Sequence, residues 1–305
     1  MELRHLRYFT AVVQWNGYRE AARHRNVAQP ALSQAVSELE EELGVKLFIR
    51  EKRRARLTPE GEVFYSEAVR VLEQAQHAME AARRAARGEI GTLRIGFLGS
   101  ATSSFLPGLI RLYRQRYPGV KLVLEELTPL KQEEAFARGE LDLCFTRPLS
   151  KEQLALFHTR LLYKEPLLVA MPDHCAPAGK RVALKSYDGK PLILFHRRGA
   201  PELYDSITAL CNEAGFIPRV EHEPNMMQTL LSLVASEAGV AIVPACVSNL
   251  RADGVKFLRT VPDHARVELI AAWPKGNPSV VLQSFLDLIK DRADDILAKA
   301  KTHIP

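Results

Sequence analysis

The chain has 305 residues, 47% hydrophobic and 26% charged, which suits a globular protein of two or three units and excludes one small domain. No apolar run is long enough to span a bilayer, and the N-terminus lacks the layout of a secretion signal, so we expect a cytoplasmic protein without a membrane partner. The net charge is +6, and residues 1–58 hold eleven Lys and Arg against seven Asp and Glu, which predicts an anionic partner for this end of the chain.

Apolar residues at helical spacing predict three helices within residues 1–57. The first ends at Gly17, the second runs from Tyr18 to His24, and the third from about Gln29 to Leu43. Pro30 suits the first turn of the third helix, where its missing N–H costs nothing. The second and third helices together have the lengths and the short connection of a helix-turn-helix unit.

In such a unit the second helix lies in the major groove of DNA, and its first residues reach base edges. Glutamine pairs with adenine, serine serves a base or a phosphate, and the basic run at 50–56 is placed to hold the neighbouring backbone. The alternative, a small helical bundle without nucleic acid, is disfavoured because five cations in seven residues would repel one another. The expected DNA contacts are Gln29, Pro30, Ser33, Gln34, Ser37, Arg50, Lys52, Arg53, Arg54 and Arg56.

A long helix is expected to follow this unit. Thr58 and Pro59 form a helix start signal, and the helix continues to about Arg87. Apolar residues between Tyr65 and Ala86 repeat at three-four spacing in a narrow stripe, which is typical of a dimerisation helix. The alternative is a solvated helix that packs only on its own chain.

From residue 91 onward, short apolar segments alternate with amphipathic ones. The expected strands span 92–97, 121–127, 141–145, 167–171, 192–195, 240–243 and 267–273. The expected helices span 106–117, 129–138, 201–214, 226–237 and 279–299. This alternation predicts parallel sheets with helices on both faces. Because about 210 residues are many for one sheet, we expect two α/β lobes joined by crossing strands, with a ligand cleft between them.

Signatures of catalysis and of metal binding are missing. The sequence has no Gly-x-Ser-x-Gly elbow, no phosphate-binding loop and no dinucleotide glycine pattern. The four cysteines lie more than thirty residues apart, and the nine histidines show no metal-ligand spacing. We therefore expect no enzyme activity, no metal, no cofactor, and buried cysteines with free thiols.

Helix N-termini are expected to build an anion site in the cleft. Ser100 follows the strand at 92–97, Thr128 is placed to cap a helix, and Pro201 opens another. Free N–H groups and partial positive charge at such ends favour a carboxylate. Arg147 and Arg197 are expected to add charge-assisted hydrogen bonds. Simple helix caps and ordinary surface charge are the alternatives for these residues.

Several motifs, each weak alone, are specific together. They are Glu20-Ala-Ala-Arg-His-Arg-Asn-Val-Ala-Gln-Pro-Ala-Leu-Ser33, Leu39-Glu40, Leu43-Gly44, Leu47-Phe48, Arg50, Leu57-Thr-Pro-Glu-Gly61, Gly139-Glu-Leu-Asp142 and Gly239-Val-Ala-Ile-Val-Pro244. They resemble the LysR-type transcriptional regulators along the whole chain. The Ala-Gln-Pro version at 28–30 is similar to a branch that regulates the breakdown of aromatic compounds.

The resemblance implies a multidomain protein with an all-α winged helix-turn-helix DNA-binding domain at 1–58 and a linker helix and hinge at 59–90. It implies an α/β, two-lobed, periplasmic-binding-protein-like effector domain at 91–305. Lobe I would cover about 91–162 and 268–305, and lobe II about 163–267. The implied partners are promoter DNA, a small organic-acid effector, RNA polymerase, and further copies of the chain in a homotetramer built from two dimers. The implied effector contacts are Ser100, Thr128, Pro201, Glu202 and Leu203.

Three residues depart from these expectations. Arg25 stands where the family usually has an apolar residue, which questions the packing of the second helix. Ala28 replaces a capping Ser or Thr, a loss of about 1 kcal/mol. Glu202 brings negative charge to the expected anion site. Two rival functions, a solute-binding protein of transport type and an enzyme with a DNA-binding appendage, are disfavoured by the N-terminal basic unit and by the missing catalytic constellation.

Overall fold

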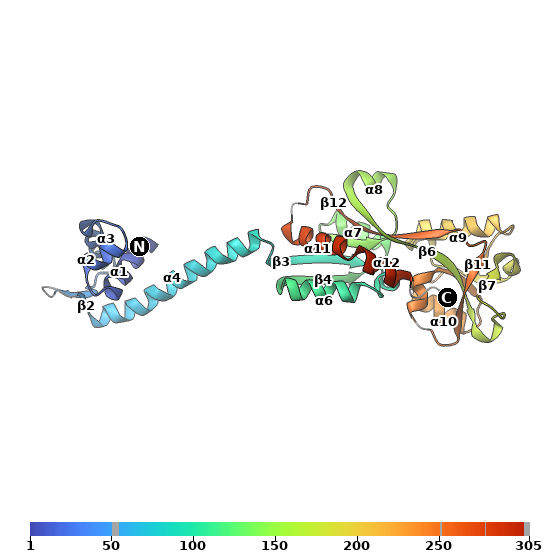
Figure 1. The fold of residues 1–305 in the computed structure, drawn as a ribbon, viewed down its shortest axis with the longest axis horizontal. Coiled ribbons are helices and arrows are strands. Elements are labelled where there is room, and N and C mark those ends of the chain that lie inside the picture. The colour runs from blue at the N-terminus through green and yellow to red at the C-terminus, as the bar shows by residue number, and fades with distance from the viewer. Residues whose placement is uncertain (51–54, 251, 278, 302–305) are drawn as a thin grey trace. The chain divides into compact units, whose positions relative to one another are not determined.

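The computed structural model describes residues 1–50, 55–250, 252–277 and 279–301. The chain divides into two packed units, Met1–Ala85 and Ala86–Pro305. Figure 1 shows the first unit in blue and the second from cyan to red.

The first unit is built on three helices and a short sheet. The helices are α1 (Leu3–Gln14), α2 (Tyr18–His24) and α3 (Gln29–Leu43), so the predicted bounds of α2 and α3 are confirmed. Strands β1 (Phe48–Arg50) and β2 (Ala55–Leu57) pair antiparallel beside them. The description of this unit as all-α was therefore wrong, because strands of three residues are too short to show a strand periodicity in the sequence.

The core of the first unit lies where α1 and α3 meet. Phe9, Leu32 and Leu39 are fully buried, as the spacing of apolar residues predicts. Gly44 ends α3 with a φ of 71°, a left-handed conformation that glycine adopts without steric cost. Leu43, the last residue of α3, is 37% exposed.

Helix α4 (Pro59–Ala86) leaves this core and continues for 28 residues. Its start signal is confirmed, since Thr58 Oγ1 accepts a hydrogen bond from the backbone N–H of Gly61 at 2.9 Å. Ala68 is buried against the core of the first unit, and Leu72 packs on it. The first half of the apolar stripe thus serves its own chain, whereas Met79 in the second half is 41% exposed.

The second unit has a mixed sheet whose strands run in the order β4-β3-β5-β12-β6-β10-β8-β9, with β11 and β7 attached beside β6. In chain order, the strands of this unit begin with β3 (Ile90–Phe97), β4 (Gly119–Glu126), β5 (Leu143–Thr146) and β6 (Phe157–Pro172). The later ones are β7 (Arg181–Ala183), β8 (Pro191–Ile193), β9 (Arg219–His222), β10 (Val240–Pro244), β11 (Val255–Val261) and β12 (Arg266–Pro274).

Strand β6 joins the two lobes. Its first part pairs with β12, and its second part pairs with β10 and β11. We call the β4-β3-β5-β12 side lobe I and the β10-β8-β9 side, with β11 and β7, lobe II. The prediction of parallel sheets is confirmed for the pairs that β3 and β8 form. It was wrong for the crossing strands, because β12 runs antiparallel to β5 and every partner of β6 runs antiparallel to it.

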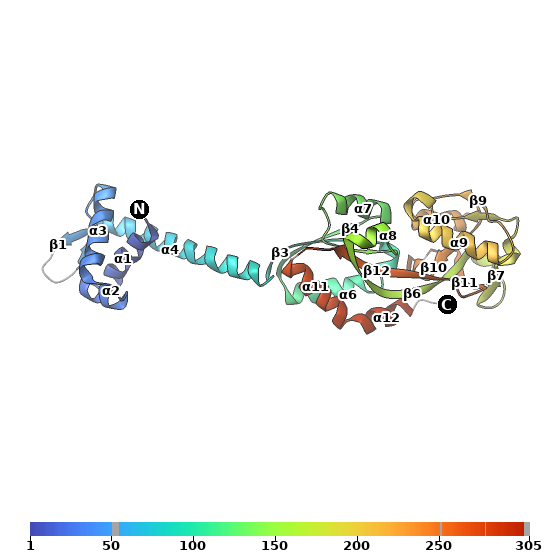
Figure 2. The same cartoon turned by 90° about the horizontal axis from the view of Figure 1, so that it is seen from above.

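Helices cover both faces of the lobe I strands, and Figure 2 shows α7 and α6 on opposite sides. The expected final helix is divided at Arg292. The α-helices of this unit are α5 (Gly99–Thr102), α6 (Leu106–Arg116), α7 (Pro129–Ala137), α8 (Lys151–Leu156), α9 (Pro201–Glu213), α10 (Met227–Ala235), α11 (Val280–Asp291) and α12 (Ala293–Lys301). Short 3₁₀ turns include η3 (Arg197–Gly199) and η4 (Ala245–Leu250).

Candidate functional site

Helix α3 presents a polar face at its N-terminal end. The residues expected to read bases all reach the surface, with Ser33 half-buried and the others exposed: Gln29, Pro30, Ser33, Gln34 and Ser37. Leu32 and Val36 on the opposite face are buried in the core. The helix is therefore held by its apolar side, which leaves the polar side free of the unit's own packing.

The two departures near α3 have different consequences. Ala28 precedes the helix in an extended conformation without a side-chain cap, as expected from its methyl side chain. Arg25 ends α2 and is exposed, while Ala21 and Ala22 supply the buried face of that helix. Arg25 thus does not disturb the packing that its charge called into question.

One member of the acidic cluster at the end of α3 has a structural role. Glu40 is buried, and its Oε1 accepts hydrogen bonds from the backbone N–H groups of Leu47 at 2.8 Å and Phe48 at 3.2 Å. Its Oε2 accepts from Lys46 Nζ at 2.7 Å. Burial alone raises the pKa of Glu40, but these hydrogen bonds outweigh it and lower the pKa below its usual range. The carboxylate therefore fixes the start of β1.

Two residues of the basic run lie in the β1–β2 sheet. Arg50 is the last residue of β1 and pairs with Ala55. Arg56 lies in β2, pairs with Ile49 and is exposed. Lys52, Arg53 and Arg54, three of the expected phosphate contacts, lie outside the described residues.

The second unit contains an open pocket between α7 in lobe I and the start of α9 in lobe II. Its volume, including the open mouth, is about 610 Å³. The residues that line it are Pro129, Leu130, Gln132, Glu133, Phe136, Cys144, Thr146, Arg147, Pro148, Leu149, Gln153, Phe157, Arg198, Pro201 and Glu202. Eight of these fifteen residues are apolar, which suits an organic ligand.

The pocket contains some of the expected effector contacts and not others. Arg147, Pro201 and Glu202 line it. Thr128 does not, although its hydroxyl caps α7 by accepting a long hydrogen bond of 3.5 Å from the backbone N–H of Lys131. The cap was predicted, but the structure gives this side chain no place in the pocket wall.

Two further expected contacts are engaged elsewhere. Arg197 forms two hydrogen bonds with the carboxylate of Asp205, at 2.8 and 3.0 Å, and its neighbour Arg198 lines the pocket instead. Leu203 is buried in the hydrophobic core. The sequence does not show which of two adjacent arginines faces the pocket, because neighbouring side chains in a 3₁₀ turn point in different directions.

Arg147 is already paired. Its Nη1 and Nη2 both donate to Glu165 Oε1 at 3.1 Å, and Nη1 also donates to the carbonyl oxygen of Glu268 at 3.0 Å. Both charged side chains are buried. Burial opposes the positive charge, but Glu165 outweighs it and raises the pKa of Arg147 above its ordinary value. Glu165 thus compensates the charge of Arg147, and the expected contact of Arg147 with an effector stays a prediction for a residue that lines the pocket.

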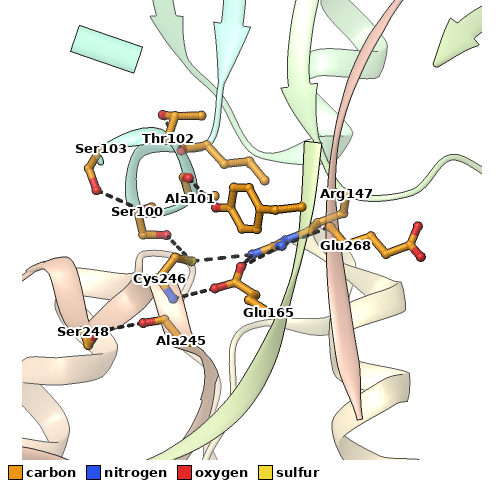
Figure 3. A network of polar contacts seen from close by, with 12 residues as sticks. Ser100, Ala101, Thr102, Ser103, Arg147, Glu165, Ala245, Cys246, Ser248 and Glu268 are labelled. Atoms are coloured by element: carbon orange, nitrogen blue, oxygen red, sulfur yellow. Dashed lines mark hydrogen bonds and ion pairs between the residues drawn. The ribbon is translucent and has the colours of Figure 1, made fainter. Parts of the chain in front are cut away.

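The pair belongs to a polar network between the lobes (Figure 3). Glu165 Oε2 accepts from the backbone N–H of Cys246 in η4 at 2.6 Å, and Arg147 Nη2 donates to Cys246 Sγ at 3.7 Å. The Cys246 thiol is placed to donate to Ser100 Oγ in α5 at 3.9 Å, so Ser100 lies in this network rather than in the pocket wall. Burial raises the pKa of the Cys246 thiol far above its usual range, which keeps it protonated.

Neither Glu165 nor Gln132 was predicted from the sequence to belong to this region. A carboxylate directly before the apolar run Pro166–Met171 was the available signal for Glu165, since a charge in a buried strand needs a partner. Gln132 gave no signal, because a polar residue on an amphipathic helix is ordinarily exposed.

The cysteines agree with the expectation in part. Cys144, Cys211 and Cys246 are buried and free as expected, but Cys175 is exposed. Within the described ranges, no three acidic, His or Cys side chains are grouped as metal ligands, and no helix has the length and hydropathy to cross a bilayer.

Both units match known families. Residues 3–62 match the bacterial regulatory helix-turn-helix protein family of lysR type, and residues 86–294 match the LysR substrate binding domain. The chain belongs to the LysR family of transcriptional regulators. As a LysR-type regulator it is a DNA-binding protein with an effector-binding domain, and the expectation that it is not an enzyme is confirmed by the family.

Relatives cover nearly the whole length of this LysR-type chain. It is 34% identical to the transcriptional regulator AlsR of Bacillus subtilis (strain 168), over 94% of this chain and 95% of AlsR. It is also 34% identical to CatR of Pseudomonas putida, over 96% of this chain and 100% of CatR. Neither rival function, a transport protein or an enzyme with an appendage, fits relatives of this kind.

Solved LysR-family structures share the fold. The crystal structure of full-length CbnR complexed with its target DNA is 28% identical, covers 96% of this chain and 100% of CbnR, and has a TM-score of 0.79. Full-length BenM is 29% identical over 97% of this chain and 98% of BenM, with a TM-score of 0.57. The predicted helix-turn-helix domain followed by a two-lobed α/β domain is confirmed.

Proposed function

We propose that this LysR-type regulator binds a small organic acid in the pocket between α7 and α9, and that the bound acid alters its action on promoter DNA. The pocket itself carries the proposal, because it combines an apolar wall with two helix N-termini and an arginine. A ligand shifts a regulator only as far as it binds one arrangement of the lobes better than another.

The mouth of the pocket has the electrostatics of a monocarboxylate site. Pro129 and Pro201 occupy the first turns of α7 and α9, where backbone N–H groups lack helical acceptors. Arg198 adds a cation at the same mouth. Glu133 and Glu202 also line the pocket and oppose any anion, so the proposal assigns the attraction for a single carboxylate to the two helix N-termini and Arg198.

The apolar residues of the pocket favour a flat apolar body. Phe136 and Phe157 lie with ring centroids 4.9 Å apart, and Leu149 lines the same pocket. Aromatic rings of this kind pack well against an aromatic ligand. This supports an effector from the breakdown of aromatic compounds, as the resemblance of residues 28–30 first suggested.

On DNA, we assign base reading to the exposed face of α3 and phosphate contacts to the basic run at 50–56. The exposed second half of α4, including Met79, is assigned to a dimer contact, and two such dimers would form a tetramer that contacts RNA polymerase. The proposed domains are 1–58, 59–90 and 91–305. Within the last, lobe I covers about 91–162 and 268–305, and lobe II about 163–267.

Calorimetry of the full chain against aromatic and aliphatic monocarboxylates tests the effector site. Arg198→Ala is expected to weaken binding of every acid by about tenfold, the loss of one charge-assisted hydrogen bond. Arg197→Ala is the matched control, because Arg197 is paired with Asp205 outside the pocket wall. Equal losses from the two variants, or no binding by any acid, would contradict the proposal.

A further inference from the structure

The pocket between α7 and α9 has exposed charged side chains of both signs. Glu133, Arg198 and Glu202 line it, and all three are exposed. Within the ranges that the structure describes, none of these three side chains forms a hydrogen bond or an ion pair. The neighbouring Arg197 differs, because it is paired with Asp205 outside the pocket wall. The charges that line the pocket are therefore available to a ligand.

These charges do not balance within the pocket. Arg147, the other cation that lines it, is compensated by Glu165. Arg198 offsets the charge of only one of the two glutamates, so the lining keeps one negative charge in excess. This excess opposes the attraction of a simple carboxylate to Arg198 and to the helix N-termini. A ligand that carries a cation beside its carboxylate removes the conflict.

Each glutamate lies close to a helix N-terminus that favours an anion. Pro129 and Pro201 are in the first turns of α7 and α9, where backbone N–H groups lack helical acceptors. Glu133 follows Pro129 by about one helical turn, so both lie on the same side of α7. Glu202 directly follows Pro201, and the turn η3 that contains Arg198 packs against α7. Groups that bind an anion and groups that bind a cation are thus adjacent, as the carboxylate and the ammonium group of an α-amino acid require.

Glu202 has an alternative role that needs no ligand. A negative side chain in the first turn of a helix interacts favourably with the helix dipole, and Glu202 occupies such a position in α9. This role does not extend to Glu133, which lies beyond the first turn of α7. The two glutamates differ in their positions on the helices, and what they share is a place in the wall of the pocket.

We infer that the effector is an aromatic α-amino acid that binds as a zwitterion. Its carboxylate is bound by Arg198 and the two helix N-termini, and its ammonium group donates hydrogen bonds to Glu133 and Glu202. Its ring packs against Phe136 and Phe157. The inference rests on the proposed acid site between α7 and α9, and it gives the two glutamates the task of selecting amino acids over simple acids.

Calorimetry of the full chain with two matched sets of compounds tests this inference. The first set is L-phenylalanine, 3-phenylpropionate, which lacks the ammonium group, and phenethylamine, which lacks the carboxylate. The second set is L-tryptophan, indole-3-propionate and tryptamine. At least one amino acid is expected to bind about tenfold tighter than its deaminated acid, because the glutamates attract the cation and oppose the free acid. It is also expected to bind tighter than its amine, which leaves Arg198 without an anion.

Removing one glutamate is expected to change the two affinities in opposite directions. Glu133→Gln and Glu202→Gln should each weaken binding of the amino acid about fivefold and tighten binding of the deaminated acid, because each variant removes one negative charge. Glu134→Gln is the control, since Glu134 is the exposed neighbour of Glu133 and does not line the pocket. The control is expected to change neither affinity, and circular dichroism reports whether each variant is folded.

The possible failures are distinguishable. If no compound binds, or only the amines bind, the acid site and the zwitterion are both wrong. If the deaminated acids bind as tightly as the amino acids or tighter, the acid site stands and only the contact with the ammonium group is wrong. This comparison uses the unchanged protein, so it decides even if a variant does not fold. Folded Glu133→Gln and Glu202→Gln variants that weaken both kinds of ligand alike, or neither, would also overturn the inference.

Discussion

Arg147 and Glu165 form a buried ion pair where the two lobes meet, with both terminal nitrogens of Arg147 at 3.1 Å from one carboxylate oxygen of Glu165. The other oxygen of Glu165 accepts from the backbone of Cys246 in lobe II, while Arg147 follows β5 of lobe I. The pair thus ties three segments together at the crossing strand β6. It also compensates the charge of an arginine that lines the pocket.

Removing one partner of this pair is expected to be more damaging than removing both. Glu165→Gln should lower the free energy of unfolding by about 3–5 kcal/mol, because a buried charge is left without compensation. The double variant Arg147→Met with Glu165→Leu should lose less, since no charge is then buried. Urea unfolding followed by Trp273 fluorescence, in a Trp15→Phe background, isolates the second unit. A double variant less stable than Glu165→Gln would contradict this account.

The stability of the first unit is expected to depend on pH through Glu40. Its pKa is lowered in the folded state, so its contribution is complete above the unfolded value of about 4.3 and is lost as the pH falls through the lower folded value. Glu40→Gln should cost about 1–2 kcal/mol at pH 7 and flatten the pH dependence below about pH 5. Urea unfolding monitored by Trp15 fluorescence measures both effects. The exposed Glu41→Gln is the control and should change neither.

Base reading and phosphate contact are expected to separate in two variants of the first unit. Ser33→Ala on α3 should relax sequence preference, with losses of about 1 kcal/mol confined to the preferred operator. Arg56→Ala, in an exposed residue of β2, should weaken binding to all sequences alike and reduce the salt slope by about one. Fluorescence anisotropy over a panel of operators and salt concentrations measures this. Identical behaviour of the two variants would refute the division of roles.

Local signals allowed most of the first unit to be predicted, whereas contacts between distant segments did not show in the sequence. The bounds of α3 follow from Pro30 in its first turn and Gly44 directly after its last residue, which are signals within or next to the helix itself. The partner of Arg147 is eighteen residues away, and no local pattern marks it. The hydrogen bonds of Gln132 likewise depend on where Leu127 and Phe145 place their carbonyl groups.

Strand β6 shows the same limit in the fold. Its second half is a continuous buried apolar run that was predicted as 167–171. Its first half alternates exposed and partly buried residues because it pairs with β12 at the surface of lobe I, and it was missed. Because the first half of β6 was not predicted, its antiparallel pairing with β12 could not be predicted either. Strand–helix alternation alone therefore led to the expectation of parallel sheets.

The second half of α4 is expected to mediate dimerisation. Met79 is 41% exposed on the predicted stripe, so Met79→Glu should place like charges in the contact and raise the dimer dissociation constant at least tenfold. Val63→Glu is the control on the same helix, since Val63 is 68% exposed but lies off the stripe. Sedimentation equilibrium measures both. A dimer weakened by Val63→Glu and not by Met79→Glu would move the contact to another face of α4.

A variant of Ser100 distinguishes two locations for the acid. One is the pocket between α7 and α9, and the other is the polar network between the lobes. Its hydroxyl lies 3.9 Å from the Cys246 thiol, and the residue is absent from the pocket wall. Ser100→Ala is therefore expected to change acid affinity less than twofold, because no ligand contact is removed. Its effect should instead be a loss of about 0.5–1 kcal/mol in stability, from one weak hydrogen bond between lobes. Calorimetry and urea unfolding on the same variant give the two values. A tenfold loss of acid affinity at unchanged stability would place the acid beside Ser100 and Cys246, as the sequence alone had suggested, and would remove it from the wall that contains Gln132.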